Sequence, residues 1–249
     1  MLVDVHCHLD DEKFDKDIGA VISRAKKAGV GAIVCNGTSP ASNRKVLKLA
    51  GRFDIVKAAL GLFPANALKL TDAEVDKELN FIREQKSQIV ALGEVGIDFL
   101  CVNGEEERAR MFEIFAKIVR LANSIRKPLI VHSRKAESEV LDLLKVAKVP
   151  VLMHFYCGNA ELVKIGVERG YYFTIPTSVL RSKTMRKLAK RVPIDKILTE
   201  TDASALRFEG GRNEPSNVRF SVAKIARLKG VSAAEMERQI WENYAKVFR

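Results

Sequence analysis

The stretch IVKAALGLFPANALKLTDAEVDKELNFIREQKSQIVALGE, residues 55–94, contains one strand–helix–strand unit. Two short apolar runs, residues 55–60 and 89–94, begin with β-branched Ile and Val and have the length of buried strands. Between them, GLFP (residues 61–64) ends the first run, and TDAE (residues 71–74) has the pattern of a helical capping box. Strands that alternate with helices are parallel, and strands that are apolar throughout are buried on both faces.

The same alternation extends in both directions and predicts eight strand–helix units. Eight units favour a closed (β/α)₈ TIM barrel over an open doubly wound sheet, and such barrels typically have roughly 250 residues. We therefore expect one single-domain barrel over residues 1–249. The expected strands are residues 2–6, 31–35, 55–60, 89–94, 128–132, 151–155, 171–175 and 196–202. The expected helices are residues 14–28, 40–50, a helix from 71, 105–125, 134–146, 159–168, 181–191, 217–228 and 233–247.

The charge of the chain is unbalanced, with 42 Lys and Arg against 31 Asp and Glu and a formal net charge of +11. This excess indicates an anionic partner, and it favours nucleic acid over a lipid surface. Adaptation to heat is the alternative, because it enriches charged surface residues and depletes glutamine, which occurs here only at positions 85, 88 and 239. The basic segment 181–191 is better explained as a solvated helix face than as a binding site.

The sequence shows no sign of membrane insertion or export. No apolar run approaches the roughly 18 residues of a membrane span, and no signal-peptide core precedes His6. The four cysteines, Cys7, Cys35, Cys101 and Cys157, have no CxxC or disulfide-framework spacing. We expect a soluble cytoplasmic protein with reduced thiols.

All four histidines lie at or near the predicted carboxyl end of a strand: His6, His8, His132 and His154. A single histidine in such a place is more often an ordinary hydrogen-bonded residue. Four at the same end favour a functional site, because active sites of this barrel form where strands end and helices begin. Since side chains alternate along a strand, His6 and His8 point to the same side, which in a barrel is the interior.

Two carboxylates lie at corresponding positions, Glu94 at the end of the fourth strand and Asp202 at the end of the eighth. An unpaired buried carboxylate costs several kcal/mol, and a divalent cation removes that cost. Four imidazoles and two carboxylates exceed the ligand set of one tetrahedral zinc, so two ions about 3.5–4 Å apart are favoured. Two Zn, Mg or Mn ions suit the cleavage of phosphodiesters.

Six blocks of this sequence can be compared with known families: VDVHCHLD (residues 3–10), GEVGIDF (93–99), PLIVHSR (128–134), HFYCG (154–158), ETD (200–202) and RNEPSNV (212–218). Taken in order, they resemble the blocks of the TatD-like metal-dependent deoxyribonucleases. The resemblance implies a barrel related to the amidohydrolases, a two-metal centre, and hydrolysis of nucleic-acid phosphodiesters, typically by exonuclease action on single-stranded DNA.

The resemblance also implies a role for each ligand. One ion is held by His6, His8 and Asp202, the second by His132 and His154, and Glu94 bridges them. Asp202 and Glu94 are the expected catalytic residues, with Asp202 touching both a metal and the attacking water. Many amidohydrolases have a carboxylated lysine after the fourth strand. This chain has Glu94 there, which favours the nucleases among the related barrels.

Several positions that would face the substrate depart from the family pattern. The family commonly has a histidine where this chain has Phe63, and Pro followed by an aromatic residue where this chain has Ser204 and Ala205. The family also has a glutamine in the helix that follows Glu94, and this chain lacks it and has Arg108 near that position. The substrate-binding candidates are Arg134, which could hold a phosphate by two hydrogen bonds but could equally be a surface arginine, and Arg212 of the last block.

Three functions follow from these observations, and the leading one is a two-metal deoxyribonuclease. The second retains the metal site but cleaves an amide or an ester, including the ester of an aminoacyl-tRNA, because Phe63 and Ala205 weaken the inference on substrate. The third is a nucleic-acid-binding protein without turnover, against which the complete ligand set argues. The physiological metal, the choice between DNA and RNA, and the oligomeric state stay open.

Overall fold

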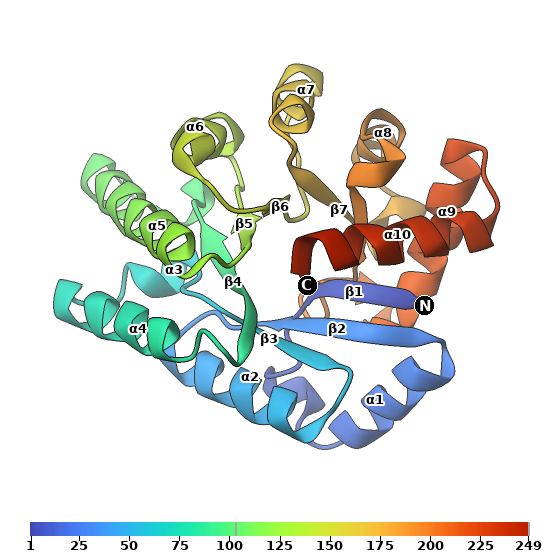
Figure 1. Cartoon of the computed structure of the whole chain (residues 1–249), viewed down its shortest axis with the longest axis horizontal. Helices are drawn as coiled ribbons and strands as arrows, with labels where there is room; N and C mark the ends of the chain where they lie inside the picture. Colours follow the sequence, from blue (N-terminus) through green and yellow to red (C-terminus); the bar gives the residue numbers. More distant parts are fainter. Residues whose placement is uncertain (103, 249) are drawn as a thin grey trace.

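The computed structural model describes residues 1–102 and 104–248, and it contains an eight-stranded parallel sheet in the order β1 to β8. Helices surround the sheet (Figure 1). The predicted TIM-barrel architecture is therefore confirmed. The strands are β1 (Leu2–Cys7), β2 (Val30–Asn36), β3 (Val56–Leu60), β4 (Ile89–Gly96), β5 (Leu129–His132), β6 (Val151–Met153), β7 (Tyr172–Pro176) and β8 (Ile197–Glu200).

Strands β8 and β1 lie side by side and nearly close the barrel. The Thr199 hydroxyl donates to the Val3 carbonyl oxygen at 2.7 Å, and the Asp202 backbone N–H donates to the His6 carbonyl oxygen at 2.9 Å. This junction brings Asp202, two residues after β8, next to His6 of β1. Two predicted ligands that are far apart in sequence thus become neighbours.

The helices begin and end largely where local signals predict. At the start of α4 the Thr71 and Glu74 side chains cap each other's backbone N–H groups, as the TDAE pattern predicts. The helices are α1 (Ile18–Lys27), α2 (Pro40–Arg52), α3 (Pro64–Ala67), α4 (Asp72–Glu84), α5 (Glu105–Ile125), α6 (Glu137–Leu143), α7 (Ala160–Glu168), α8 (Lys183–Arg191), α9 (Val218–Lys229) and α10 (Ala233–Phe248).

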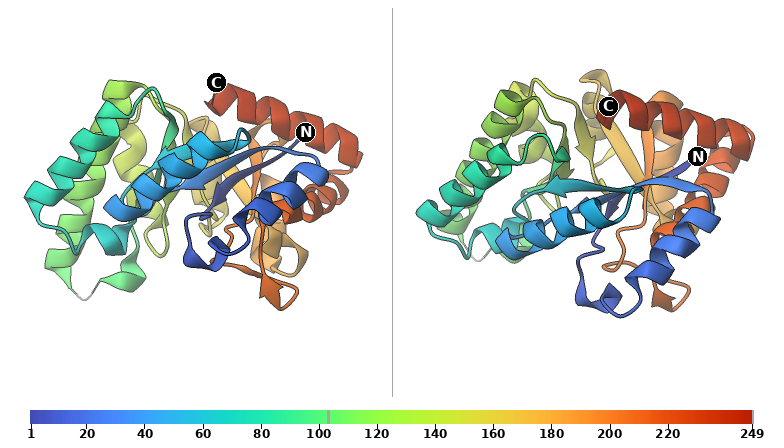
Figure 2. Two further views of the ribbon diagram at one scale, coloured as in Figure 1. Left: turned by 90° about the horizontal axis from the view of Figure 1, so that it is seen from below. Right: turned by 60° about the horizontal axis from the view of Figure 1, so that its bottom comes forward.

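Helix α10 lies across the amino-terminal end of the strands. Its Asn243 side chain donates to the carbonyl oxygens of Ile194 and Ile197, at the start of β8. Both chain ends lie on one side of the molecule (Figure 2). The opposite, carboxyl end of the strands is therefore free to carry the site. Among the described helices, none is long and apolar enough to cross a membrane.

The structure differs from the sequence-based expectation in several local details. Helix α1 begins at Ile18 rather than near 14, β6 ends at Met153 rather than at 155, and β8 ends at Glu200 rather than at 202. Helix α6 begins at Glu137 rather than near 134, because Lys135 has a left-handed backbone (φ 60°) that a continuous helix cannot contain. Helix α3 was not predicted. A small antiparallel hairpin of β9 (Arg207–Phe208) and β10 (Gly211–Arg212), also not predicted, follows β8.

Candidate metal centre

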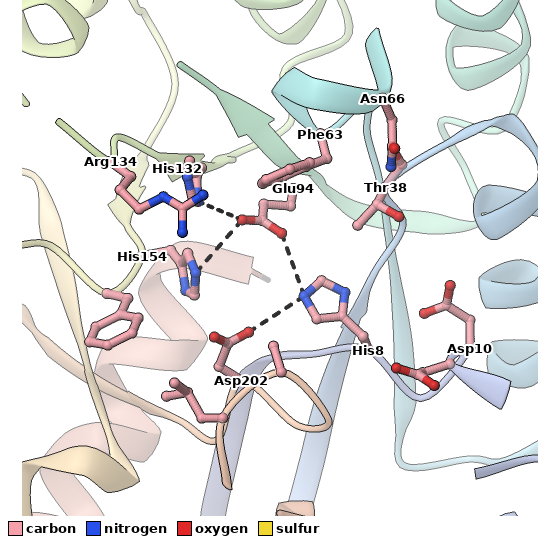
Figure 3. Close-up of a pocket in the computed structure, with 14 residues that line it drawn as sticks. His8, Asp10, Thr38, Phe63, Asn66, Glu94, His132, Arg134, His154 and Asp202 are labelled. Atoms are coloured by element: carbon pink, nitrogen blue, oxygen red, sulfur yellow. Dashed lines mark hydrogen bonds and ion pairs between the residues drawn. The ribbon is translucent and has the colours of Figure 1, made fainter. Parts of the chain in front are cut away.

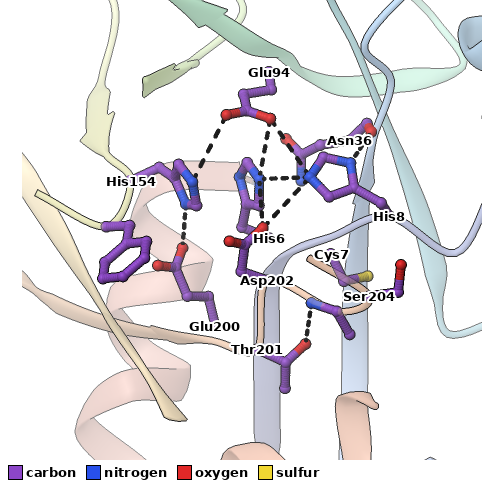
Figure 4. A network of polar contacts seen from close by, with 12 residues as sticks. His6, Cys7, His8, Asn36, Glu94, His154, Glu200, Thr201, Asp202 and Ser204 are labelled. Carbon is purple, nitrogen blue, oxygen red and sulfur yellow. Dashed lines mark hydrogen bonds and ion pairs between the residues drawn. The ribbon is translucent and has the colours of Figure 1, made fainter. Parts of the chain in front are cut away.

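A cleft of about 630 Å³ opens at the carboxyl ends of the strands (Figure 3). Five of the six predicted ligand residues line it. His6 is fully buried beneath them, beside His8, Glu94 and Asp202 (Figure 4). The five lining residues are His8, Glu94, His132, His154 and Asp202.

Glu94 lies at the centre of the cluster, between two pairs of histidines. Its Oε2 atom is 3.5 Å from Nε2 of both His6 and His8. Its Oε1 atom is 2.8 Å from Nδ1 of His132 and 3.7 Å from Nε2 of His154. Each carboxylate oxygen therefore faces one histidine pair.

Asp202 completes the side of the cluster nearest β1. Its Oδ1 atom is 3.5 Å from Nε2 of His8 and 3.8 Å from Nε2 of His6. The backbone of Asp202 is left-handed (φ 50°), a conformation that Asp adopts more readily than most residues. This turn directs the carboxylate toward the histidines.

The potential ligand atoms form three overlapping groups, each with its atoms within 4.8 Å of one another. Glu94 belongs to two of these groups and His6 to two. The groups are His6, His8 and Glu94; Glu94, His132 and His154; and His6, His154 and Asp202.

In three of the histidines, the ring nitrogen that points away from Glu94 donates a hydrogen bond to a backbone or carboxylate oxygen. Nδ1 of His8 is 3.0 Å from the Asn36 carbonyl oxygen. Nδ1 of His154 is 2.7 Å from Oε2 of Glu200, and Nε2 of His132 is 3.0 Å from Oδ2 of Asp98. Since a carbonyl or carboxylate oxygen can only accept, these bonds put a proton on the outer nitrogen of each ring and turn the inner nitrogen toward Glu94. Metal-binding histidines have the same kind of outer partner.

Sequence reasoning did not identify these outer partners. Asp98 and Glu200 belong to the GEVGIDF and ETD blocks, so both were visible, but without an assigned role. Asn36 contributes a backbone oxygen at the end of β2, which no residue pattern could indicate.

The electrostatics of the cluster favour a cation. Burial alone would lower the pKa of His8, but the hydrogen bond with Asp202 and the charge of Glu94 raise it to about 10. Glu200 likewise overcomes burial and raises the pKa of His154 to about 9. Burial would raise the pKa of Glu94, but His6 and His132 hold it well below its ordinary value. Without metal, the carboxylates therefore draw protons onto His8 and His154. Burial has the opposite effect on His6 and lowers its pKa.

The donor set fits divalent metal ions. Nε2 of His6 and Nε2 of His8 lie only 3.2 Å apart, and both face carboxylate oxygens. Imidazole nitrogens combined with carboxylate oxygens are typical ligands of zinc and other divalent transition metals. A cation would take the place of the protons that the cluster otherwise attracts.

The structure brings one of the two predicted substrate-binding arginines to the cleft. The side chain of Arg134 lines the cleft, and its guanidinium bonds Oδ2 of Asp98 at 2.6 and 2.9 Å. Arg212 instead pairs with Asp17 at 2.6 Å and lies over the Phe14 ring. It lines a separate hollow beside the hairpin, so its contact with substrate stays a prediction.

Two of the positions that depart from the family pattern face the cleft. Phe63 lines it with its ring edge-on to His132, the ring centroids 5.0 Å apart, and Ala205 lines it from the loop after β8. Arg108 instead lies over the ring of Phe99.

Comparison with known proteins places these features in a family. The model of the family "TatD related DNase" matches residues 3–249. The uncharacterized metal-dependent hydrolase MJ1582 of Methanocaldococcus jannaschii is 35% identical over 99% of this chain and 96% of its own length. Human deoxyribonuclease TATDN3 is 35% identical over 99% of this chain and 94% of its own.

A solved structure agrees with this relationship. The crystal structure of YJJV, a TatD homolog from Escherichia coli, superposes with a TM-score of 0.90 at 26% identity, covering 99% of this chain and 97% of that one. The family model and the relatives span nearly the whole chain, so the resemblance carried by the six sequence blocks is confirmed. This chain belongs to the TatD related DNase family and is a metal-dependent hydrolase.

Proposed function

We propose that this chain is a deoxyribonuclease that degrades single-stranded DNA from an end and uses two divalent metal ions. The observation that carries this proposal is the position of Glu94, whose two oxygens each face a different histidine pair. A carboxylate shared in this way is suited to bridging two ions. The human relative named as a deoxyribonuclease supports DNA as the substrate.

Six side chains would hold the ions. His6, His8 and Asp202 would bind one, His132 and His154 the other, and Glu94 both. When bound, divalent ions lower the pKa of water and stabilise negative charge on the attacking and leaving oxygens of a phosphodiester. Asp98, Glu200 and the Asn36 carbonyl would keep three of the imidazoles in the orientation and tautomer that binding requires.

In this proposal Asp202 acts as the general base. Burial would raise its pKa, but the hydrogen bond with His8 and the positive charge of His154 hold the pKa below its ordinary value. The carboxylate is thus ionised at neutral pH and lies at the cleft surface. It can take the proton of the attacking water while the water oxygen bonds phosphorus, the P–O ester bond breaks and the released oxygen gains a proton.

In this proposal Arg134 binds the phosphate. Its side chain is 53% exposed, and Asp98 engages only part of its guanidinium group. The remaining N–H groups can donate to phosphate oxygens in the cleft. Because Asp98 also holds His132, the same carboxylate positions a substrate contact and a metal ligand.

Hydrolysis of another ester or an amide, including the ester of an aminoacyl-tRNA, is the second candidate. Phe63, Ala205 and Leu206 give the cleft an apolar wall beside the metal ligands. Phe63 and Ala205 of this wall are positions where the family pattern is not followed, which favours testing substrates other than DNA.

Metal analysis combined with turnover tests this proposal. Purified protein reconstituted with Zn, Mn or Mg is incubated with 5′-labelled and 3′-labelled oligonucleotides, single-stranded and duplex, and with an aminoacyl ester and an amide. We expect mononucleotides released progressively from single strands, and no release by Glu94→Gln. Turnover of the ester or amide alone would support the second candidate. Binding of DNA without turnover of any substrate would indicate a non-catalytic protein.

A further inference from the structure

Helices α8 and α9 carry an unusual concentration of positive charge. Together they contain nine Lys and Arg residues and no Asp or Glu. The two helices lie side by side (Figure 1), and the Lys229 ammonium of α9 donates to the Lys190 carbonyl oxygen of α8 at 2.9 Å. We call this region the α8–α9 basic surface. Its residues are Lys183, Arg186, Lys187, Lys190, Arg191, Arg219, Lys224, Arg227 and Lys229.

Most of these side chains face outward. On α8, Lys183, Lys187, Lys190 and Arg191 are exposed and follow the spacing of a single helical face, while Met185, Leu188 and Ala189 are buried against the barrel. Arg219 and Arg227 are exposed on α9. Six of the nine charges are therefore exposed on two neighbouring helices.

The α8–α9 basic surface lacks counter-charges. Within residues 1–102 and 104–248, none of its nine cations lies within 4 Å of a carboxylate. Elsewhere on the surface such pairs are common, for example Lys117 with Asp76 and Arg110 with Asp72. Heat adaptation favours networks of opposite charges, whereas clustered like charges repel each other and need another explanation.

A chain of contacts connects this surface with the metal-centre cleft. Arg181, just before α8, donates to the Arg207 carbonyl oxygen at 2.6 Å and so joins the helix to the β9–β10 hairpin. Arg207 lines a hollow of about 250 Å³ together with Ala205. Ala205 also lines the metal-centre cleft, so the two depressions share a wall.

We propose that the α8–α9 basic surface binds the phosphate backbone of single-stranded DNA that extends out of the cleft past the hairpin. The proposal rests on the proposed function for the identity of the polymer. Neutralising phosphates with Lys and Arg releases condensed counterions, which supplies most of the affinity for DNA without sequence preference. A strand held there would keep its end in the cleft through successive cleavages.

A lipid surface fits this region less well than a nucleic acid. Proteins that lie on membranes insert apolar side chains beside their basic ones. The large apolar side chains exposed in the described chain are Met1, Leu100, Val146 and Leu180. Only Leu180 lies near this region, three residues before the start of α8, and a single leucine is not an apolar face.

Charge-neutral variants of matched size test the proposal. The test variant is Lys187→Gln, Lys190→Gln and Arg191→Gln on α8. Its control, Lys77→Gln, Arg83→Gln and Lys86→Gln, removes three exposed cations on and next to α4. Fluorescence anisotropy measures the binding of a labelled single-stranded 30-mer between 50 and 300 mM salt. EDTA is present to remove metal ions, so that the strand is not cleaved during the measurement.

We expect the test variant to bind about 10-fold more weakly at low salt, with the slope of log K against log salt reduced by about 2, since each contact with a single strand contributes about 0.7. The control should bind as the unmodified protein does. A second variant, Lys224→Gln and Arg227→Gln on α9, should lose affinity in the same direction. Unchanged thermal unfolding of each variant shows that the fold is retained.

Three results would overturn the proposal. Equal losses in the test and control variants would mean that only net charge matters. Unchanged binding of DNA by both the α8 and α9 variants would exclude this surface as a DNA-binding site. Binding to vesicles of anionic phospholipid is measured in parallel, and variants that lose vesicle binding but retain DNA binding would identify the surface as a membrane-binding site. Hydrolysis of a dinucleotide by the unmodified protein is measured separately. If DNA binding depends on α8 but no hydrolysis occurs, the proposed function is contradicted and the α8–α9 basic surface is still a DNA-binding site.

Discussion

Nε2 of His132 lies 3.0 Å from Oδ2 of Asp98, an oxygen that also accepts from Arg134. Burial would raise the pKa of Asp98, but its bonds with His132 and Arg134 lower it to about 2. The ionised carboxylate fixes the His132 ring with Nδ1 toward Glu94. One acidic side chain thus determines how a candidate metal ligand and a candidate phosphate contact are presented to the cleft.

Asp98→Asn should therefore weaken metal binding although Asp98 is not itself an expected ligand. The amide has no net charge to hold the His132 N–H or the guanidinium. We expect the affinity for the more weakly held ion to fall about 10- to 100-fold, as for other partners of metal-binding histidines. Calorimetric titration with Zn or Mn measures this. Asp76→Asn, which removes an exposed carboxylate paired with Lys117, is the control and should bind metal normally.

The number of ions provides an independent test of the site. Reconstituted protein should contain about two divalent ions per chain, measured by elemental analysis. His6→Ala and His132→Ala should each reduce binding, because they are assigned to different ions. Glu94→Gln should release at least one ion and lose activity in parallel, because the bridging charge is removed. Less than one ion per chain in the unmodified protein would contradict the two-metal assignment.

Much of the fold could be predicted because its signals are local. Each strand is a short apolar run, and α4 begins at the Thr71 capping box that the sequence displays. The grouping of His6, His132 and His154 followed from a general property of this barrel, in which all strands end at the same face.

Details that depend on tertiary contacts could not be predicted. The choice of His132 Nδ1 as the nitrogen that faces Glu94 is set by Asp98, 34 residues away in sequence. Arg212 pairs with Asp17, 195 residues earlier, and no local sequence pattern could predict that contact. The hairpin after β8 has strands of only two residues, which are too short to show the alternation of apolar and polar residues that predicts a strand.

The pair of Arg24 with Glu214, 2.7 Å apart, should contribute to stability in a pH-dependent way. Burial would raise the pKa of Glu214, but bonds from Arg24 and Ser216 hold it below its ordinary value. A folded-state pKa below the unfolded one stabilises the protein above about pH 4.3, the ordinary glutamate value. That contribution is lost as the pH falls through the lower, folded-state value.

Glu214→Gln should accordingly lower the unfolding temperature at pH 7 by an amount equivalent to at most about 1 kcal/mol, because Arg24 is partly exposed to solvent. The difference from the unmodified protein should shrink below about pH 4. Thermal unfolding followed by circular dichroism between pH 3 and 7 measures it. Glu139→Gln, an exposed change on α6, is the control. A difference that grows toward acid pH would contradict the predicted direction.

Substitution of Asp202 by Asn separates the role of a ligand from that of a base. Asn, like Asp, tolerates the left-handed backbone at this position, so the turn that follows β8 should be retained. The amide keeps one oxygen toward His8 but cannot accept the proton of the attacking water. We therefore expect metal content to fall only in part while hydrolysis falls about 100-fold or more, the scale of lost general-base assistance.

The measurement is metal content and the rate of oligonucleotide hydrolysis on the same preparation of Asp202→Asn, with metal added back to saturation. Saturating metal should not restore the rate, because the missing group is the proton acceptor and not the ion. If metal restored it fully, Asp202 would be a ligand alone. An Asp202→Asn variant as active as the unmodified protein would remove Asp202 from the mechanism and require another base among the groups that line the cleft.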